Sequence, residues 1–331
     1  MKKGDRIVIR VTEITFPCED VPVLLARFMK DRKLHTAGEA SRNLMPMSEV
    51  LTRMVRNIDD RYHVGDQWEY YCPENADWIS YGWIGGLMNT YPMLALGDEE
   101  HLRKVKNTFD FGLPRAKGKS GYYYDVLGSD GKVLYRDAAA NNPGIGLTRK
   151  NGDVLYWMVK QFMLLKEQGK VSVIDAGWET NVRLLADAFV NTWKKEGTWG
   201  NYLNVETGDV AVYNTTSGAM AVAGLALASE YYKNLSYLEV ACEAAADYYD
   251  NFALVGFTSG GCGDILQNAD SETAVALLTS LMTLYEVTGK EQYLKQSADL
   301  ANLCATWTVS FPYRLPEDTP LAKLGANLTG P

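Results

Sequence analysis

The sequence predicts an all-α protein built from repeated helical hairpins. Three observations predict this class: apolar residues recur at helical spacing along much of the 331-residue chain, short polar turns interrupt that pattern repeatedly, and strand-like alternation is confined to short stretches. Hydrophobic residues make up 47% of the chain, which is ample for a large core. A repeat of this kind is typical of helical hairpins that stack or close into a ring.

The clearest hairpin lies near the C-terminal end. From 270 to 285 apolar residues fall at i, i+3, i+4 and i+7, Gly289 is placed to end the helix, and a second helix is expected over 290–305. The same plan returns three times, with turns near Gly97, Gly169 and Asn234. These hairpins are predicted over 78–111, over 153–169 with 175–193, and over 217–252.

The two ends of the chain differ from this repeat. Helical segments near 20–32 and 47–57 supply part of a fifth hairpin, whereas residues 4–14 alternate like a strand. We therefore divide the chain into a strand-like leader, interpreted as the remnant of a preceding sheet domain, a helical domain and an irregular tail. The bounds are 1–18, 19–307 and 308–331.

The long connections between hairpins are predicted to share one face of the domain. They are rich in Tyr, Trp, Asn and Asp, and the chain holds 20 Tyr and 8 Trp. Two of them, 121–137 and 198–214, have the pattern of β-hairpins around Gly131 and Gly208. Long decorated loops on a rigid scaffold are where binding usually occurs, so we expect the functional site on this face.

Composition argues against several classes of protein. The net charge is −8 and no Lys/Arg stripe is present, which disfavours a nucleic-acid or anionic-membrane partner. The best apolar run, 217–230, is too short to span a membrane, and no signal-peptide core follows the N-terminal lysines, so the chain as it stands is expected in the cytoplasm, with an exported parent left open. Five scattered Cys without a CxxC pair, and three His, predict no disulfide framework, metal site or cofactor.

The repeated turns "LALGDEEHL" and "VTGKEQYL", together with the Trp/Tyr/Asp-rich loops, resemble the six-hairpin glycosidase superfamily over roughly residues 47–307. The resemblance implies an (α/α) toroid, with about five of six hairpins visible and small β-hairpins in the loops of one face. It also implies that catalytic carboxylates lie at or just before the first turns of the inner helices. The matching positions are Asp77, Asp153, Asp270 and Glu272, with Asp125, Asp137 and Asp264 as secondary candidates.

Hydrolysis of a glycosidic bond needs two carboxyl groups, a general acid and a base or nucleophile. We expect Asp153 to act with Asp270 or Glu272, and Asp77 to bind substrate. A structural alternative exists for these acids. Asp270 immediately before a helix and Glu272 in its first turn are also what an N-cap and a favourable helix-dipole charge look like.

Further residues are expected to bind the substrate. Arg149 is placed to grip a substrate carboxylate, or alternatively to pair with Asp137 or Asp153. His63 is expected to hydrogen-bond a sugar or carry a proton, as histidines do in epimerases of this fold, or else to be structural. Aromatic rings suit the C–H faces of sugars. The rings expected to line the funnel are Trp78, Trp83, Trp157, Trp199, Tyr202 and Tyr213.

The function predicted from these features is glycoside hydrolysis of an oligo- or polysaccharide by paired carboxylates in an aromatic-lined funnel, without metal or cofactor. Two alternatives stay open. One is a non-catalytic carbohydrate-binding fragment of a larger glycosidase. The other is a toroid sugar epimerase or lyase, which would rely on His, Tyr or Arg, and the scarcity of His in the loops disfavours the epimerase.

Overall fold

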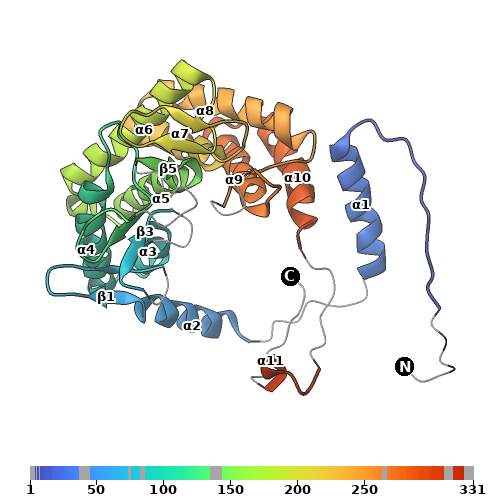
Figure 1. Ribbon diagram of the computed structural model, residues 1–331, viewed down its shortest axis with the longest axis horizontal. Helices are drawn as coiled ribbons and strands as arrows, with labels where there is room; N and C mark the ends of the chain where they lie inside the picture. Colours follow the sequence, from blue (N-terminus) through green and yellow to red (C-terminus); the bar gives the residue numbers. More distant parts are fainter. Residues whose placement is uncertain are drawn as a thin grey trace.

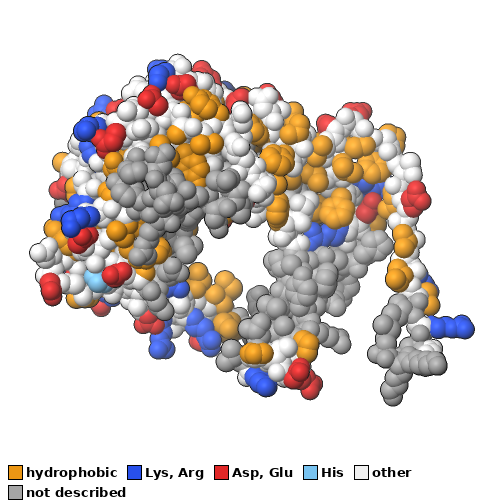
Figure 2. Space-filling model, in the orientation of Figure 1, with side chains coloured by type: hydrophobic (Ala, Val, Ile, Leu, Met, Phe, Trp, Pro, Cys, Tyr) orange, Lys and Arg blue, Asp and Glu red, His pale blue; other side chains and the backbone are white. Residues whose placement is uncertain are grey.

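The computed structural model describes residues 8–36, 45–73, 76–82, 86–134, 144–262, 267–308 and 316–323, with Gly4 and Arg6. Within these residues the predicted class is confirmed, because helices dominate and curve in an arc around a central opening (Figure 1). Side chains leave this opening unfilled in the space-filling view (Figure 2). In the described part of the chain, no helix is long and apolar enough to span a bilayer.

In the described part of the chain, four helical hairpins form the arc, and all four were predicted. Each pairs an inner helix with the outer helix that follows it. The pairs are α3 (Gly86–Ala95) with α4 (Glu99–Ala116), α5 (Thr148–Glu167) with α6 (Ala176–Glu196), α7 (Ala219–Tyr232) with α8 (Leu235–Tyr248), and α9 (Ser271–Thr288) with α10 (Glu291–Ala305).

Neighbouring inner helices pack side by side in chain order, from α3 through α5 and α7 to α9. Two further helices lie at the ends of the arc, where α1 (Val21–Thr36) packs against α10 and α2 (Met47–Asp59) meets α3. Three short elements complete the helical set among the described residues. They are the 3₁₀ turn η1 (Val171–Val173), the π-turn η2 (Tyr249–Ala253) and α11 (Pro320–Lys323).

Small residues bring α7 close to both of its inner neighbours. A Cβ on Gly152 of α5 would lie 2.8 Å from the Ala221 backbone nitrogen, so only glycine permits this approach. On the other side, Ser280 of α9 donates to the Ala219 carbonyl at 2.7 Å and accepts from the Ala223 amide at 3.0 Å. As a result, every residue from 219 to 226 is buried.

The predicted turns have the expected geometry with one difference. Gly97, Gly169 and Gly289 adopt positive φ, the conformation that favours glycine at the end of a helix. Between α7 and α8 the left-handed residue is Lys233, at φ 56°. The adjacent Asn234 instead caps α8, because its side chain accepts from the Ser236 amide.

Short antiparallel strands decorate one end of the inner helices. The pairs are β1 (Tyr62–Val64) with β2 (Glu69–Tyr71), β3 (Trp78–Ser80) with β4 (Val126–Gly128), and β5 (Ile145–Leu147) with β6 (Tyr202–Asn204), which also pairs with β7 (Val210–Val212). The β-hairpin predicted at 198–214 is therefore confirmed as β6–β7. In the other predicted hairpin, the described residues form one bridge, between Leu127 and Val133, and β4 pairs with the distant β3.

The strand predicted over 4–14 is wrong within the described residues. Residues 8–19 form neither helix nor strand, and Val8, Ile9 and Val11 are at least four-fifths exposed. Alternation alone does not make a strand, since a strand needs an edge with which to pair, and none of the described residues offers one here.

Candidate functional site

The four inner helices begin on the same side of the arc, where the long connections lie. Residues 117–147, 197–218 and 254–270 lead into α5, α7 and α9 and carry strands β4 to β7, whereas the turns on the other side are short. The predicted division into a plain and a decorated face is therefore confirmed. Three helix N-termini with their positive dipole ends are thereby brought to one region.

The N-terminus of α5 is the most polar buried segment of this face. The helix begins at Thr148, so Asp153 lies inside its second turn and not at its mouth as predicted. Arg149, Lys150, Asn151 and Asp153 are all buried. The first residues of α5 include no side-chain cap, because residues from elsewhere in the chain accept hydrogen bonds from its first amides. The Thr148 amide donates to the Asn201 carbonyl, and the Arg149 amide donates to Ser217 Oγ.

Arg149 and Asp153 form a buried ion pair. The guanidinium Nε lies 3.1 and 3.2 Å from the two carboxylate oxygens, and Asp153 has no exposed surface. Nη1 of the same guanidinium donates to the backbone carbonyl of Glu272 at 3.0 Å. The pairing of Arg149 with Asp153, which was the alternative interpretation, is thus observed. Arg149 ties the start of α5 to the first turn of α9.

Asp270 caps α9. Its Oδ1 accepts from the Thr273 amide at 2.7 Å and from the Thr273 hydroxyl at 2.8 Å, and Oδ2 accepts from the Gly261 amide at 2.9 Å. Only 5% of the residue is exposed. Both carboxylate oxygens are therefore engaged by the fold, which favours the capping interpretation over direct catalysis.

Glu272, in the first turn of α9, differs from Asp153 and Asp270. It is partly exposed, and its Oε1 accepts from the Cys262 thiol at 3.0 Å. Its Oε2 is buried and meets no hydrogen-bond donor among the described residues. The backbone of the same residue is held by Arg149. Glu272 is consequently a fixed carboxyl group with unused hydrogen-bonding capacity on the decorated face.

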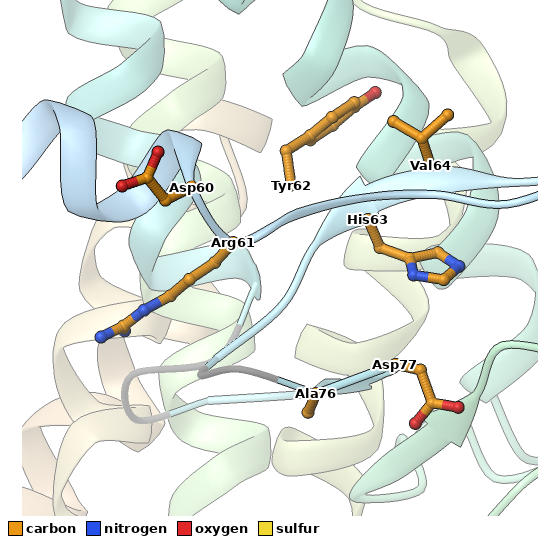
Figure 3. Close-up of a pocket in the computed structure, with 7 residues that line it drawn as sticks. All are labelled: Asp60, Arg61, Tyr62, His63, Val64, Ala76 and Asp77. Atoms are coloured by element: carbon orange, nitrogen blue, oxygen red, sulfur yellow. The ribbon is translucent and has the colours of Figure 1, made fainter.

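A second polar site surrounds His63 and Asp77 on the outer part of this face. A pocket of about 570 Å³ is lined by Asp60, Arg61, Tyr62, His63, Val64, Ala76 and Asp77. Figure 3 shows the side chains of Arg61 and His63 on the side of β1 that faces Ala76 and Asp77, and Tyr62 on the other. Arg61 donates to the Pro73 carbonyl at 2.8 Å, and the His63 ring packs 4.9 Å from that of Tyr70.

Asp77 does not precede a helix, contrary to the prediction, because the residues after it form β3. It is exposed at the rim of the pocket. Burial raises the pKa of the neighbouring Cys72 to about 12, and the Asp77 charge adds to this effect, so that thiol is no candidate nucleophile. The residues that line this pocket are different from those that contact Arg149 and Glu272, which are Ser217, Asp153 and Cys262. The predicted set thus falls into two places.

The aromatic residues expected in the funnel take different positions. Trp199 has no exposed surface, packs its indole against Phe189 and Trp193, and donates from Nε1 to the Phe189 carbonyl, which makes it a core residue. Tyr202 is 4% exposed in β6, whereas Tyr213 is 43% exposed and donates to Glu196.

Two other predicted aromatic residues are partly exposed, Trp78 in β3 and Trp157 on α5. Trp83, Asp137 and Asp264 lie outside the described residues.

Sequence reasoning gave no role to Lys150 or to the Cys262 thiol. Lys150 is 1% exposed and lies 3.9 Å from Asp125, whose carboxylate accepts from the Leu147 amide. No periodicity marks such a buried lysine in advance. Among the residues that the structure describes, no group of three or more His, Cys, Asp or Glu side chains is placed to hold a metal ion.

Comparisons with known proteins bear on the fold. No family model matches the chain, and no curated protein matches its sequence. The structure aligns with a cellobiose 2-epimerase from Bacillus thermoamylovorans B4167 at a TM-score of 0.58 and 11% identity, over 84% of this chain and 73% of that one. A D-mannose isomerase aligns at a TM-score of 0.54 and 14% identity, over 86% and 74%.

A third solved structure, a possible member of the GH105 family from Klebsiella pneumoniae subsp. pneumoniae MGH 78578, aligns at a TM-score of 0.51 and 14% identity, over 80% of this chain and 77% of that one. The chain therefore has the (α/α) toroid fold of six-hairpin glycosidase-like proteins. Similarity of this degree describes the scaffold, and the reaction has to be argued from the site.

Proposed function

We propose that the protein is a carbohydrate-active enzyme that hydrolyses a glycosidic bond, with Glu272 as the general acid or base. The fold supports a sugar substrate, since the aligned structures include a cellobiose 2-epimerase and a D-mannose isomerase. The observation that carries the proposal is the Glu272 carboxyl group. It combines a fixed position, a place in the first turn of an inner helix and a buried oxygen without a donor.

An unsatisfied oxygen of this kind is costly to the fold. Leaving a buried acceptor without a hydrogen bond costs about 1–3 kcal/mol, so such groups in proteins call for an explanation. A glycosidic oxygen or sugar hydroxyl brought to Glu272 would supply the missing partner. General acid–base catalysis requires that kind of contact between a carboxyl group and the reacting oxygen.

Arg149 and Asp153 support Glu272 as positioning residues. Arg149 binds the Glu272 carbonyl, and Asp153 holds the guanidinium from the opposite side. A buried ion pair that loses one partner leaves an uncompensated charge. We therefore retain Asp153 in the machinery, acting through Arg149, and no longer as the first carboxylate.

The second carboxyl group is proposed to come from Asp137 or Asp264. In the sequence, Asp264 follows two residues after Cys262, whose thiol contacts Glu272. Substitution of each by Asn identifies the partner, because loss of the true second carboxylate should lower turnover as strongly as loss of Glu272 does.

The test is release of reducing sugar from a panel of plant and bacterial glycans by wild type and Glu272→Gln. We expect Gln to lower turnover by about 10²- to 10⁴-fold, the usual contribution of general acid–base catalysis. Glu286→Gln is the matched control, since Glu286 is exposed on the same helix and should leave turnover unchanged. Activity of Glu272→Gln above half that of wild type would refute the assignment.

A second candidate, sugar epimerisation or isomerisation, is favoured by His63. Its imidazole lies in an open pocket with Asp77 and Arg61, and the same fold carries a cellobiose 2-epimerase. Proton exchange at a sugar carbon, followed by NMR in D₂O, would reveal this reaction, and His63→Gln would abolish it. Exchange without bond hydrolysis would replace the hydrolase proposal. Binding by calorimetry without either reaction would indicate a carbohydrate-binding protein.

A further inference from the structure

A lysine and three aromatic rings gather midway along the inner helices α3 and α5. Lys160 Nζ lies 5.3, 5.0 and 5.4 Å from the ring centroids of Tyr91, Tyr156 and Trp157, and it donates to the Tyr156 hydroxyl at 2.9 Å. The Tyr91 ring, on α3, lies 5.4 Å from that of Trp157. We refer to Tyr91, Tyr156, Trp157 and Lys160 as the Lys160 cluster.

The cluster faces the central opening of the arc. Helix α5 is covered by α7 on one side, by α3 on the other and by α6 behind, so its exposed side chains have one direction left. Trp157 and Lys160 are partly exposed and one turn apart on α5, while nearly all residues around them on that helix are buried. Tyr91 is the partly exposed residue that α3 adds beside them.

Lys160 makes no ion pair within the described residues. Lys104 and Lys150, by contrast, each lie beside an Asp. An ammonium group has three N–H donors, and among the described residues the acceptor that Lys160 contacts is the Tyr156 hydroxyl. Cation–π contacts stabilise the charge but consume no acceptor. The group is therefore held in place with donors to spare.

Trp157 adds a second unused donor to the cluster. Its indole Nε1 is buried and meets no acceptor among the described residues. An indole nitrogen can only donate, and buried polar groups without a partner are rare in folded proteins. Ammonium and indole together call for a ligand that supplies oxygen acceptors and negative charge, next to flat rings that suit the C–H face of a sugar.

We propose that the Lys160 cluster is a subsite for an acidic sugar residue, whose carboxylate pairs with Lys160 while its ring packs on Trp157 and Tyr91. The inference rests on the proposed function, because it takes the substrate to be a glycan. It names the substrate class as uronate-containing. Arg149, the residue expected to grip a carboxylate, is already engaged with Asp153 and Glu272.

The test compares acidic glycans with neutral counterparts that differ in the carboxyl group alone. Short oligomers of galacturonate, of mannuronate and of the glucuronate-containing polymer hyaluronan are titrated by calorimetry, each beside its carboxyl-reduced form. The Glu272→Gln protein is used so that no turnover occurs. We expect at least one acidic oligomer to bind about tenfold or more tightly than its reduced form, the size expected for a hydrogen bond to a charged group.

Lys160→Met should remove that difference by weakening the acidic oligomer about tenfold while leaving the neutral one within about twofold. Lys160→Arg should restore much of it, because the charge returns. Lys166→Met is the matched control, since Lys166 lies on the same helix as Lys160 and its Nζ is 3.6 Å from the centroid of the Tyr231 ring of α7. The subsite is overturned if no acidic oligomer is preferred, or if the preference survives Lys160→Met.

Sugar release by the wild-type protein is measured in parallel and tests the hydrolase proposal alone. Preference for acidic oligomers without release keeps the subsite and refutes hydrolysis. Release of sugar without a preference for acidic oligomers supports hydrolysis and refutes the subsite. The two proposals can therefore fail separately.

Discussion

Replacement of Asp270 by Ala should destabilise the protein more than the loss of an ordinary helix cap. Asp270 accepts from the Thr273 amide and hydroxyl with one oxygen and from the Gly261 amide with the other. Loss of the cap costs about 1 kcal/mol, and removal of the Asp270 oxygen that accepts from the buried Gly261 amide adds about 1–3 kcal/mol. The free energy of unfolding should therefore fall by about 2–4 kcal/mol.

Urea denaturation followed by far-UV circular dichroism measures this loss, and thermal melting gives a second reading. At an unfolding entropy of about 2.1 cal/mol/K per residue, a change of 1 kcal/mol moves the Tm of a 331-residue chain by about 1.4 °C, so a fall of about 3–6 °C is expected. Asp270→Asn keeps an acceptor for Thr273 but turns an NH₂ group toward Gly261, which should give an intermediate loss.

Asp175→Ala is the matched control, because Asp175 caps α6 through the Gly177 amide alone and is exposed. Its loss should not exceed about 1 kcal/mol. Equal losses for Asp270→Ala and Asp175→Ala would refute the reasoning. If in addition Asp270→Asn were fully folded but inactive, Asp270 would again be a candidate catalytic carboxylate, as the sequence predicts.

Two further predictions concern helix packing and pH. Gly152→Val should lower the free energy of unfolding by about 2 kcal/mol or more, because a Cβ at this position meets the backbone of α7. Ala301→Val, on an exposed face of α10, should lower it by only a few tenths of a kcal/mol, so similar urea midpoints for the two variants would contradict the prediction. Burial acts to lower the pKa of His101, but hydrogen bonds and charge from Asp98 and Asp59 outweigh it and raise the pKa. The stability that this ion pairing adds below about pH 6.5 should therefore decline as pH rises through the raised pKa. Urea titrations at several pH values measure the decline, and His101→Gln should abolish it.

The hairpins could be predicted from the sequence because helical periodicity and turn residues are local signals. Gly97, Gly169 and Gly289 mark helix ends by the positive φ they adopt, and that requirement is visible in the residue type. The decorated face was predicted for the same reason, since it depends on the lengths of connections and not on contacts between distant residues.

Within the candidate site, several residues take positions that depend on tertiary contacts and could not be predicted from the sequence. The start of α5 at Thr148 is stabilised by Asn201, just before β6, and by Ser217, after β7, so nothing in its own residues marks it. Asp153 was therefore placed at a helix mouth when it lies inside the helix. Trp199 was expected on a funnel wall because it lies in a loop, yet that loop folds its indole into the core.

The burial of α7 has a consequence for how the arc opens. With neighbours on both sides and no exposed residue from 219 to 226, its backbone amides reach solvent only if the surrounding helices separate. Their hydrogen exchange should be the slowest in the chain and should report global unfolding. Helix α2, which has no buried residue, should exchange early. Opening motions of the arc should thus be confined to its ends, while its middle stays rigid.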